Sequence, residues 1–221
     1  MGTEAAPQSN LPPCGGDCWE IAAPICSRSE RPLPREALRM TPQRYLLAQA
    51  YNNAWANHRL LKACGQLSPQ ELAAPRTSFF PSIIHTLNHN LTVDWMYISE
   101  LEGDCIGAAA YEPEIPCPIF ADLDREQRAA DHRLIDHCRS MNDNGVSAEV
   151  RIPRDTYVEI ERADLVLLHL FQHQIHHRGQ IHAMLSGTSV KPPQLDEFFP
   201  AIPNASYYAP RILPNSASPK P

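Results

Sequence analysis

Apolar residues recur at steps of three and four along four stretches of this chain, and this spacing predicts four helices. The predicted helices span about residues 42–64, 81–101, 122–141 and 162–186. Thr41 and Pro42 supply an N-cap and a first-turn proline for the first helix, and Asp122 is the expected N-cap of the third. A glycine or an Asn-Asp-Asn-Gly turn lies just beyond each stretch, so each predicted helix has a stop signal.

Between the third and fourth predicted helices the pattern changes from a helical to a strand period. Residues 147–152 and 156–160 alternate polar and apolar side chains around Pro153-Arg154-Asp155, which predicts a short β-hairpin. The long link between the second and third helices is the other notable connection. Together these features predict an all-α fold, an antiparallel four-helix bundle with a short hairpin before the last helix, whose core can host a metal site.

The distribution of proline predicts where the folded domain begins and ends. Of 22 prolines, six precede Met40 and eight follow Val190. We therefore expect a poorly ordered N-terminal extension at residues 1–39, one domain at residues 40–200 and a Pro-rich C-terminal tail at residues 201–221. Because a helix start follows Met40 directly, residues 1–39 are either an appendage or a misassigned start, which mass spectrometry of the native N-terminus would decide.

Composition excludes several classes of protein. A length of 221 residues suits one ordinary domain, and a net charge of -6 without any basic block disfavours nucleic-acid binding. There is no run of 18 apolar residues and no secretory pattern at the start, so we expect a cytoplasmic protein without membrane contact. Seven scattered cysteines without a CxxC pair do not predict a disulfide framework.

Histidines cluster on the second and fourth predicted helices. Ten histidines placed at random would give roughly half of one pair four residues apart, whereas this chain has three such pairs. His173 and His177 share one helix face and can reach one metal ion, and a third ligand can come from His85 or His89. The alternative is that these histidines are merely hydrogen-bonded in the core, but burying several imidazoles together is offset best by a divalent cation.

Other catalytic templates are missing. Gln174 follows His173 where a metalloprotease of the HExxH type needs a glutamate, and no glutamate has a histidine three residues later, as di-iron bundles require. The phosphate-binding and nucleophile-elbow glycine motifs are also absent. Gly179 costs about 1 kcal/mol relative to alanine inside a helix, so we expect a neighbouring helix or a ligand to approach it; the alternative is a tolerated glycine near a helix end.

Three segments resemble the DinB-like family, the DinB/YfiT-like superfamily of damage-inducible bundle proteins. The matching motifs are Tyr51-Asn52-Asn53-Ala54-Trp55-Ala56-Asn57 with Leu60-Leu61, then Ser82-Ile83 and Thr86-Leu87-Asn88-His89 with Asp94, and finally His173 through Gln180. The resemblance covers roughly residues 40–198. As a set these motifs are specific, whereas taken singly only HxxxHRGQ is.

The resemblance implies one divalent metal ion, commonly zinc or nickel, held by three histidines, and frequently a homodimer. Carried over by position, the ligands are His89, His173 and His177. His85 lies one turn before His89 and is the alternative ligand or a neighbour of the site. Arg178 and Gln180 are expected to orient an anionic partner, unless Arg178 is a surface cation. His169 and His176 are expected either to support the ligands or to be structural. His182 is expected at the surface.

The family includes enzymes that act with low-molecular-weight thiols, such as mycothiol-dependent isomerases. The resemblance therefore implies a metal-dependent transferase that activates a thiol cofactor toward an electrophilic small molecule. Three neutral imidazoles leave the ion an open position, which suits this chemistry. Two alternatives stay open: a non-catalytic, stress-related protein whose metal only clamps two helices, favoured if His85 is a fourth ligand, and a hydrolase with Asp94 as the nearest carboxylate base.

Overall fold

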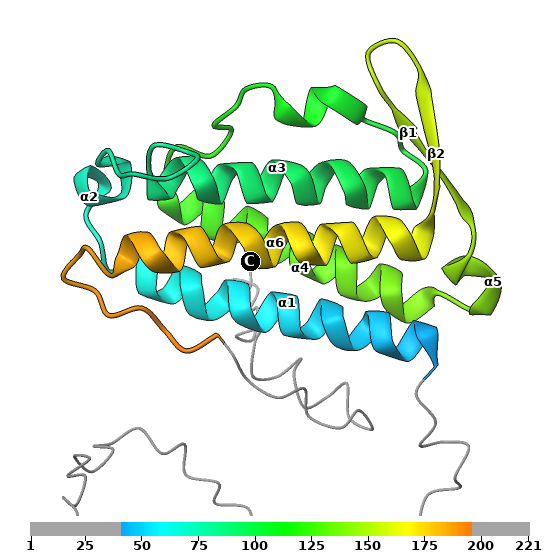
Figure 1. Cartoon of the computed structure of the whole chain (residues 1–221), viewed down its shortest axis with the longest axis horizontal. Helices are drawn as coiled ribbons and strands as arrows, with labels where there is room; N and C mark the ends of the chain where they lie inside the picture. Colours follow the sequence, from blue (N-terminus) through cyan, green and yellow to red (C-terminus); the bar gives the residue numbers. More distant parts are fainter. Residues whose placement is uncertain (1–40, 196–221) are drawn as a thin grey trace, which may run out of the picture. The chain divides into compact units, whose positions relative to one another are not determined.

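The computed structural model describes residues 41–195, and this part of the chain is mostly helical (Figure 1). The tails expected at residues 1–39 and 201–221 lie outside the described residues, as does the end of the expected domain. The elements in chain order are α1 (Pro42–Cys64), α2 (Pro69–Ala73), α3 (Ile83–Glu102), the 3-10 helix η2 (Gly107–Tyr111), α4 (Phe120–Ser140), α5 (Asp143–Val146), β1 (Glu149–Pro153), β2 (Val158–Arg162) and α6 (Ala163–Leu185).

The four long helices α1, α3, α4 and α6 correspond to the four predicted helices. The Thr41 side chain accepts a hydrogen bond from the Arg44 backbone N–H, so α1 begins where its N-cap predicted. Ser82 caps α3 in the same way, through the backbone N–H of His85. Gly103 ends α3 in the left-handed conformation, with φ of 89°, which favours glycine.

The start of α4 differs from the prediction. Ile119, not Asp122, is the N-cap residue, and no side chain caps this end. Asp122 lies in the first turn instead, where its carboxylate accepts a 2.6 Å hydrogen bond from Arg125. A carboxylate in the first turn still interacts favourably with the positive end of the helix, which explains why the predicted N-cap lay three residues late.

The short elements α2, η2 and α5 were not predicted. Ser68 and Glu71 form a capping box around α2. The Asn142 side chain accepts a hydrogen bond from the Gly145 N–H, so the segment that ends α4 also begins the single turn α5. These helices have only four or five residues, too few for a periodic apolar pattern.

The predicted hairpin is present, displaced by one or two residues. β1 and β2 pair antiparallel, with Arg151 opposite Ile160. Val150 and Ile152 of β1 are buried, whereas Val158 and Ile160 of β2 are exposed. β2 runs directly into α6, so the hairpin fixes where the last helix begins.

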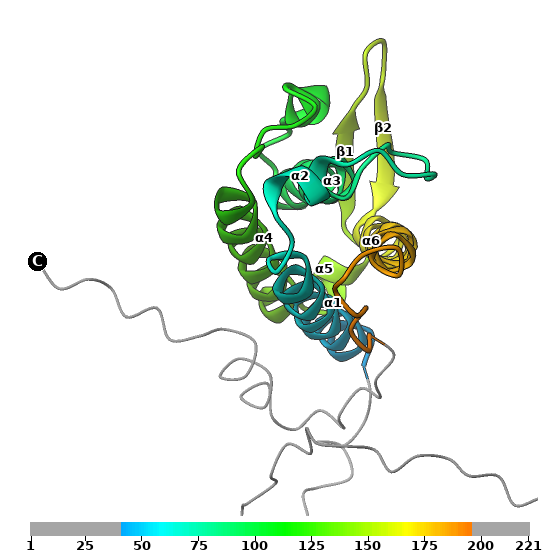
Figure 2. The same cartoon turned by 90° about the vertical axis from the view of Figure 1, so that its left-hand side faces the viewer.

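The long helices lie side by side, and α1 and α3 each pack against both α4 and α6 (Figures 1 and 2). Hydrogen bonds between side chains and neighbouring helices show which helices run in the same direction and which run in opposite directions. Gln43 reaches Cys138 and Asn57 reaches Asp131, so α1 and α4 are antiparallel.

The predicted antiparallel bundle does not hold for every neighbouring pair, and α3 and α4 depart from it. Asp94 contacts Gln127 and Glu102 contacts Arg133, so these two helices run in the same direction. The reason is the link between them, residues 103–119, which runs back along α3 before α4 begins (Figure 1). A link of this length can cross the whole helix, whereas a short loop could not.

A continuous cluster of buried apolar residues fills the space between the long helices. Cys64, Cys105, Cys117 and Cys138 are free thiols, in line with the absence of a disulfide framework among the described residues. Between residues 41 and 195, no helix combines the length and apolar character needed to cross a membrane. Gly179 is exposed, and no atom lies within 4 Å of where its Cβ would be, so no described helix approaches it.

Candidate metal centre

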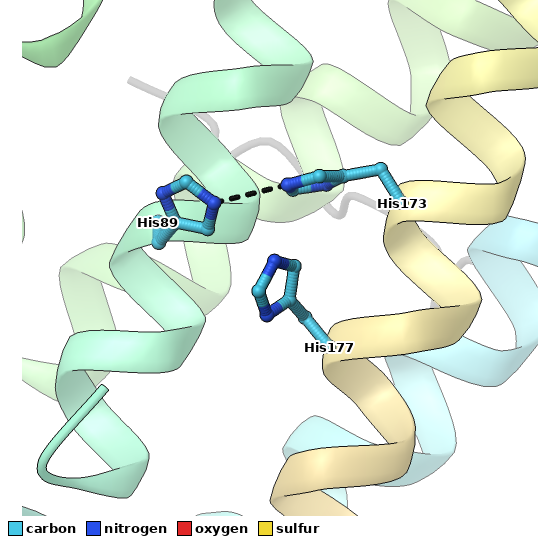
Figure 3. Close-up of side chains that lie close together, drawn as sticks. All are labelled: His89, His173 and His177. Atoms are coloured by element: carbon cyan, nitrogen blue, oxygen red, sulfur yellow. Dashed lines mark hydrogen bonds between the residues drawn. The ribbon is translucent and has the colours of Figure 1, made fainter. Parts of the chain in front are cut away.

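Three histidines from two long helices converge on one point. α3 carries His89, and α6 carries His173 and His177 on adjacent turns. α3 and α6 are antiparallel neighbours, since His89 lies against His177 while Tyr97, two turns along α3, lies against His169. In Figure 3 the three imidazole rings point toward one another across the space between these helices.

The distances suit a single cation. One ligand atom from each histidine lies within 4.8 Å of the other two. The Nε2 atoms of His89 and His173 are 2.9 Å apart, the contact drawn in Figure 3. Bonds of about 2.0–2.1 Å to zinc place tetrahedral ligand atoms about 3.3 Å apart, so small side-chain rotations bring all three nitrogens to coordination distance.

Burial and mutual repulsion keep the three imidazoles neutral. Burial, together with the neighbouring histidines His177 and His85, lowers the pKa of His89 to about 4. For the same reasons the pKa of His173 falls to about 3, and burial lowers the pKa of His177. Neutral imidazole is the form that binds a metal, so at pH 7 the ligands carry no proton that a cation would have to displace.

The contact between His89 and His173 supports the fit of a cation to this site. Among the described residues, the Nε2 atom of His173 has a polar contact only with the Nε2 atom of His89, another imidazole nitrogen. Burying an imidazole without compensation is costly. A divalent cation between the two rings would accept both Nε2 lone pairs, and the three-nitrogen donor set is one that zinc and nickel accept.

His177 is oriented by a hydrogen-bonded neighbour. Gln180 Oε1 lies 2.8 Å from His177 Nδ1, and Gln180 Nε2 lies 3.1 Å from His176 Nε2. The amide oxygen can only accept, so His177 donates through Nδ1 and keeps the lone pair of Nε2 for a metal. His176 contacts the same amide, and its role at the site stays a prediction.

Comparison with known proteins adds the family. The model described as "DinB family" matches residues 40–205, which is most of the chain. This chain belongs to the DinB family. It is also similar to the uncharacterized protein YizA of Bacillus subtilis (strain 168), with 27% identity over 121 residues that cover 53% of this chain and 72% of YizA. YizA has no described activity, so the similarity does not assign one.

Within the DinB-family motif, His85 is not one of the converging residues. Its Nε2 lies 2.8 Å from the Glu114 carboxylate, and its ring lies against that of Phe80 with centroids 4.8 Å apart.

Two further histidines of α6 lie outside the converging group. His169 packs edge-on against Tyr97 at the exposed side of α6. His182 is half-buried and bonded to the Pro193 carbonyl at 3.0 Å, so the prediction of a simple surface residue was incomplete.

Arg178 does not face the histidines of this DinB-family site. It is 5% exposed, so the alternative of a surface cation is wrong. Its guanidinium donates to the side-chain oxygens of Asn53 and Asn57 on α1. The Gln180 side chain is bonded to His177 and His176. The described contacts of Arg178 and Gln180 are therefore with other side chains of the protein, and none of them indicates a site for an anionic partner.

Sequence reasoning missed Phe80, which lies in the loop before α3. Its ring centroid is 4.3 Å from that of His89 and 5.6 Å from that of His177. Phe80 therefore covers one side of the candidate centre with an apolar ring. Metal-ligand spacing contains no signal for a loop aromatic residue, so only the folded arrangement identifies it.

Proposed function

We propose that this DinB-family protein binds one divalent metal ion, zinc or nickel, through His89, His173 and His177. We further propose that it is a metal-dependent transferase that joins a low-molecular-weight thiol to an electrophilic small molecule. The observation that carries this proposal is the convergence of three neutral imidazoles without a fourth protein ligand among the described residues. A bound metal would supply positive charge at an open position, which lowers the pKa of a thiol.

The residues around the ligands have separate roles in this proposal. Gln180 fixes the ring of His177, and Phe80 shields one side of the centre from water. In the overall reaction the thiol sulfur forms a bond to an electrophilic carbon. The thiol proton is released, and the leaving group departs with its bonding electrons.

Two observations favour this proposal over its alternatives. A structural clamp would be completed by a fourth ligand, but His85 is bonded to Glu114 instead. A hydrolase would use Asp94 as a base, but Asp94 is 1% exposed and accepts hydrogen bonds from Gln127 and Gln174 in the core. The contacts of His85 and Asp94 therefore favour thiol transfer over a structural clamp and over a hydrolase.

We infer that the long helices form a four-helix bundle, with its metal between α3 and α6, and that two chains form a homodimer. Support for the dimer is the apolar outer face of α6, where Leu165, Leu168 and Ile175 are 46%, 36% and 58% exposed. The cytoplasmic location is a prediction from the sequence.

The proposed activity is tested by following thiol consumption. Purified protein loaded with Zn²⁺ or Ni²⁺ is mixed with mycothiol, bacillithiol or glutathione and an electrophile such as an activated aryl halide. We expect a thiol-dependent rate above background that His89→Ala and chelator both abolish and His85→Ala retains. Rates equal to background with every thiol, from protein carrying one metal per chain, would contradict the transferase and favour the clamp.

A further inference from the structure

A cluster of buried polar side chains lies inside the four long helices, directly beside the candidate metal centre. Each member is at most 5% exposed. We call it the polar core cluster, and its members are Asn53, Asn57, Asp94, Asp131, Gln174 and Arg178. Every long helix contributes at least one of them. Burying this many polar groups is costly, so their arrangement calls for a physical reason.

Two members of the cluster bond α6 to two different helices. Gln174 Nε2 donates to the Asp94 carboxylate at 2.7 Å and to the Asn90 carbonyl at 3.1 Å, both on α3. Arg178 donates to Asn53 and Asn57 on α1, at 2.8 Å for Asn57. α6 is therefore held by directional bonds on both of its inner sides.

The apolar residues of α6 lie on its outer face as well as on its inner face. Leu165, Leu168 and Ile175 are exposed, while other leucines of the same helix, such as Leu167 and Leu170, are completely buried. Apolar residues on the outer face weaken the preference of a helix for one rotation about its own axis. Directional hydrogen bonds therefore add to what hydrophobic burial specifies for α6.

The positions of the two anchors along α6 connect this rotation to the metal centre. Gln174 follows His173 and Arg178 follows His177, so each anchor is adjacent to a ligand. Successive residues point about 100° apart around a helix of 3.6 residues per turn. Holding Gln174 on α3 and Arg178 on α1 therefore turns both histidines toward the space where His89 lies.

We propose that Asp94, Gln174 and Arg178 are positioning residues of the metal centre, which fix the rotation of α6 so that His173 and His177 face His89. This inference rests on the proposed metal binding. It assigns Arg178 to the core rather than to a bound partner. Buried polar groups that select one arrangement at some cost in stability are known from other helical assemblies.

The test compares Co²⁺ binding by the wild type, Gln174→Met and Leu134→Ala. Methionine keeps the volume and helix propensity of Gln174 and removes its hydrogen bonds. Leu134, 1% exposed on α4, is a control for loss of stability outside the polar core cluster. We expect Gln174→Met to bind Co²⁺ at least ten-fold more weakly and with an altered visible spectrum, whereas Leu134→Ala keeps affinity within about three-fold and the same spectrum.

The Co²⁺ measurements distinguish failure of the positioning role from failure of the proposed metal binding. Wild-type affinity and spectrum in Gln174→Met would overturn the positioning role and leave the metal centre intact, and so would equal losses in both variants. Absence of Co²⁺ binding by the wild type would overturn the proposed function together with this inference. If Gln174→Met does not fold, Asp94→Asn replaces it, since one acceptor oxygen remains and an intermediate loss of affinity is expected.

Discussion

At the scale of single residues, helix spacing predicted two of the three candidate ligands, and the choice of His89 over His85 came from the family resemblance. His173 and His177 are four residues apart, and the structure brings them together with His89 as the DinB resemblance implied. Partners of the ligands were not accessible. Gln180 was expected to contact a bound partner, but only the folded side chains place it against His177.

Gln180 provides a test of ligand orientation. Replacing it with leucine removes the acceptor that holds His177 Nδ1, so we expect metal affinity to fall about 10–100-fold while helical content is unchanged. Competition titration with a chromophoric chelator measures the affinity. Gln180→Glu keeps an acceptor and should retain tight binding. Unchanged affinity in Gln180→Leu would show that this hydrogen bond does not support the site.

The polar core cluster also has an electrostatic consequence. Burial, followed by repulsion from Asp94, raises the pKa of Asp131 to about 8. The ordinary value in an unfolded chain is about 3.9. The folded state therefore binds this proton more tightly than the unfolded state does. The contribution of Asp131 to stability is present at acid pH and is lost as pH rises from about 4 through 8.

Asp131→Asn should remove this pH dependence, because the amide cannot ionise. Between about pH 5 and pH 8 we expect the wild type to lose on the order of 1 kcal/mol of unfolding free energy per pH unit relative to the variant. Urea unfolding of both proteins with chelator present, at several pH values, measures the difference. Parallel stability curves would contradict the raised pKa.

At the scale of elements, long helices were predictable and short ones were not. The apolar period and the Thr41 cap predicted the bounds of α1 correctly. The alternation of polar and apolar residues predicted the two strands of the hairpin to within two residues of their observed bounds. α2, η2 and α5 were missed because a single turn contains no period to detect. The N-cap of α4 was misplaced because Asp122 is equally favourable in the first turn.

Gly179 is the residue of α6 whose role the fold leaves unexplained, because no described atom approaches it. Gly179→Ala should therefore raise the unfolding free energy by about 1 kcal/mol through helix propensity alone. Chemical denaturation of the metal-free protein measures this change. Destabilisation, or a loss of metal affinity, would mean that this position needs close approach by a ligand or a second chain.

At the scale of the whole molecule, local patterns predicted the helices but not all of their directions. Periodicity identifies which face of a helix is buried, not which neighbour covers it. The parallel pair α3 and α4 follows from the path of residues 103–119, where the sequence pattern does not distinguish a return along α3 from a connection at one end. The antiparallel pair α3 and α6 is the one that matters for the site, since it carries all three histidines.

In the proposed function, one divalent metal ion joins α3 to α6 through His89, His173 and His177. The most direct test is metal stoichiometry and affinity, measured by elemental analysis and calorimetry on the wild type and four single alanine variants. We predict one zinc or nickel per wild-type chain and at least 100-fold weaker binding in each of His89→Ala, His173→Ala and His177→Ala. His85→Ala should bind like the wild type. Full occupancy in the three ligand variants, or loss in His85→Ala alone, would contradict metal binding by His89, His173 and His177.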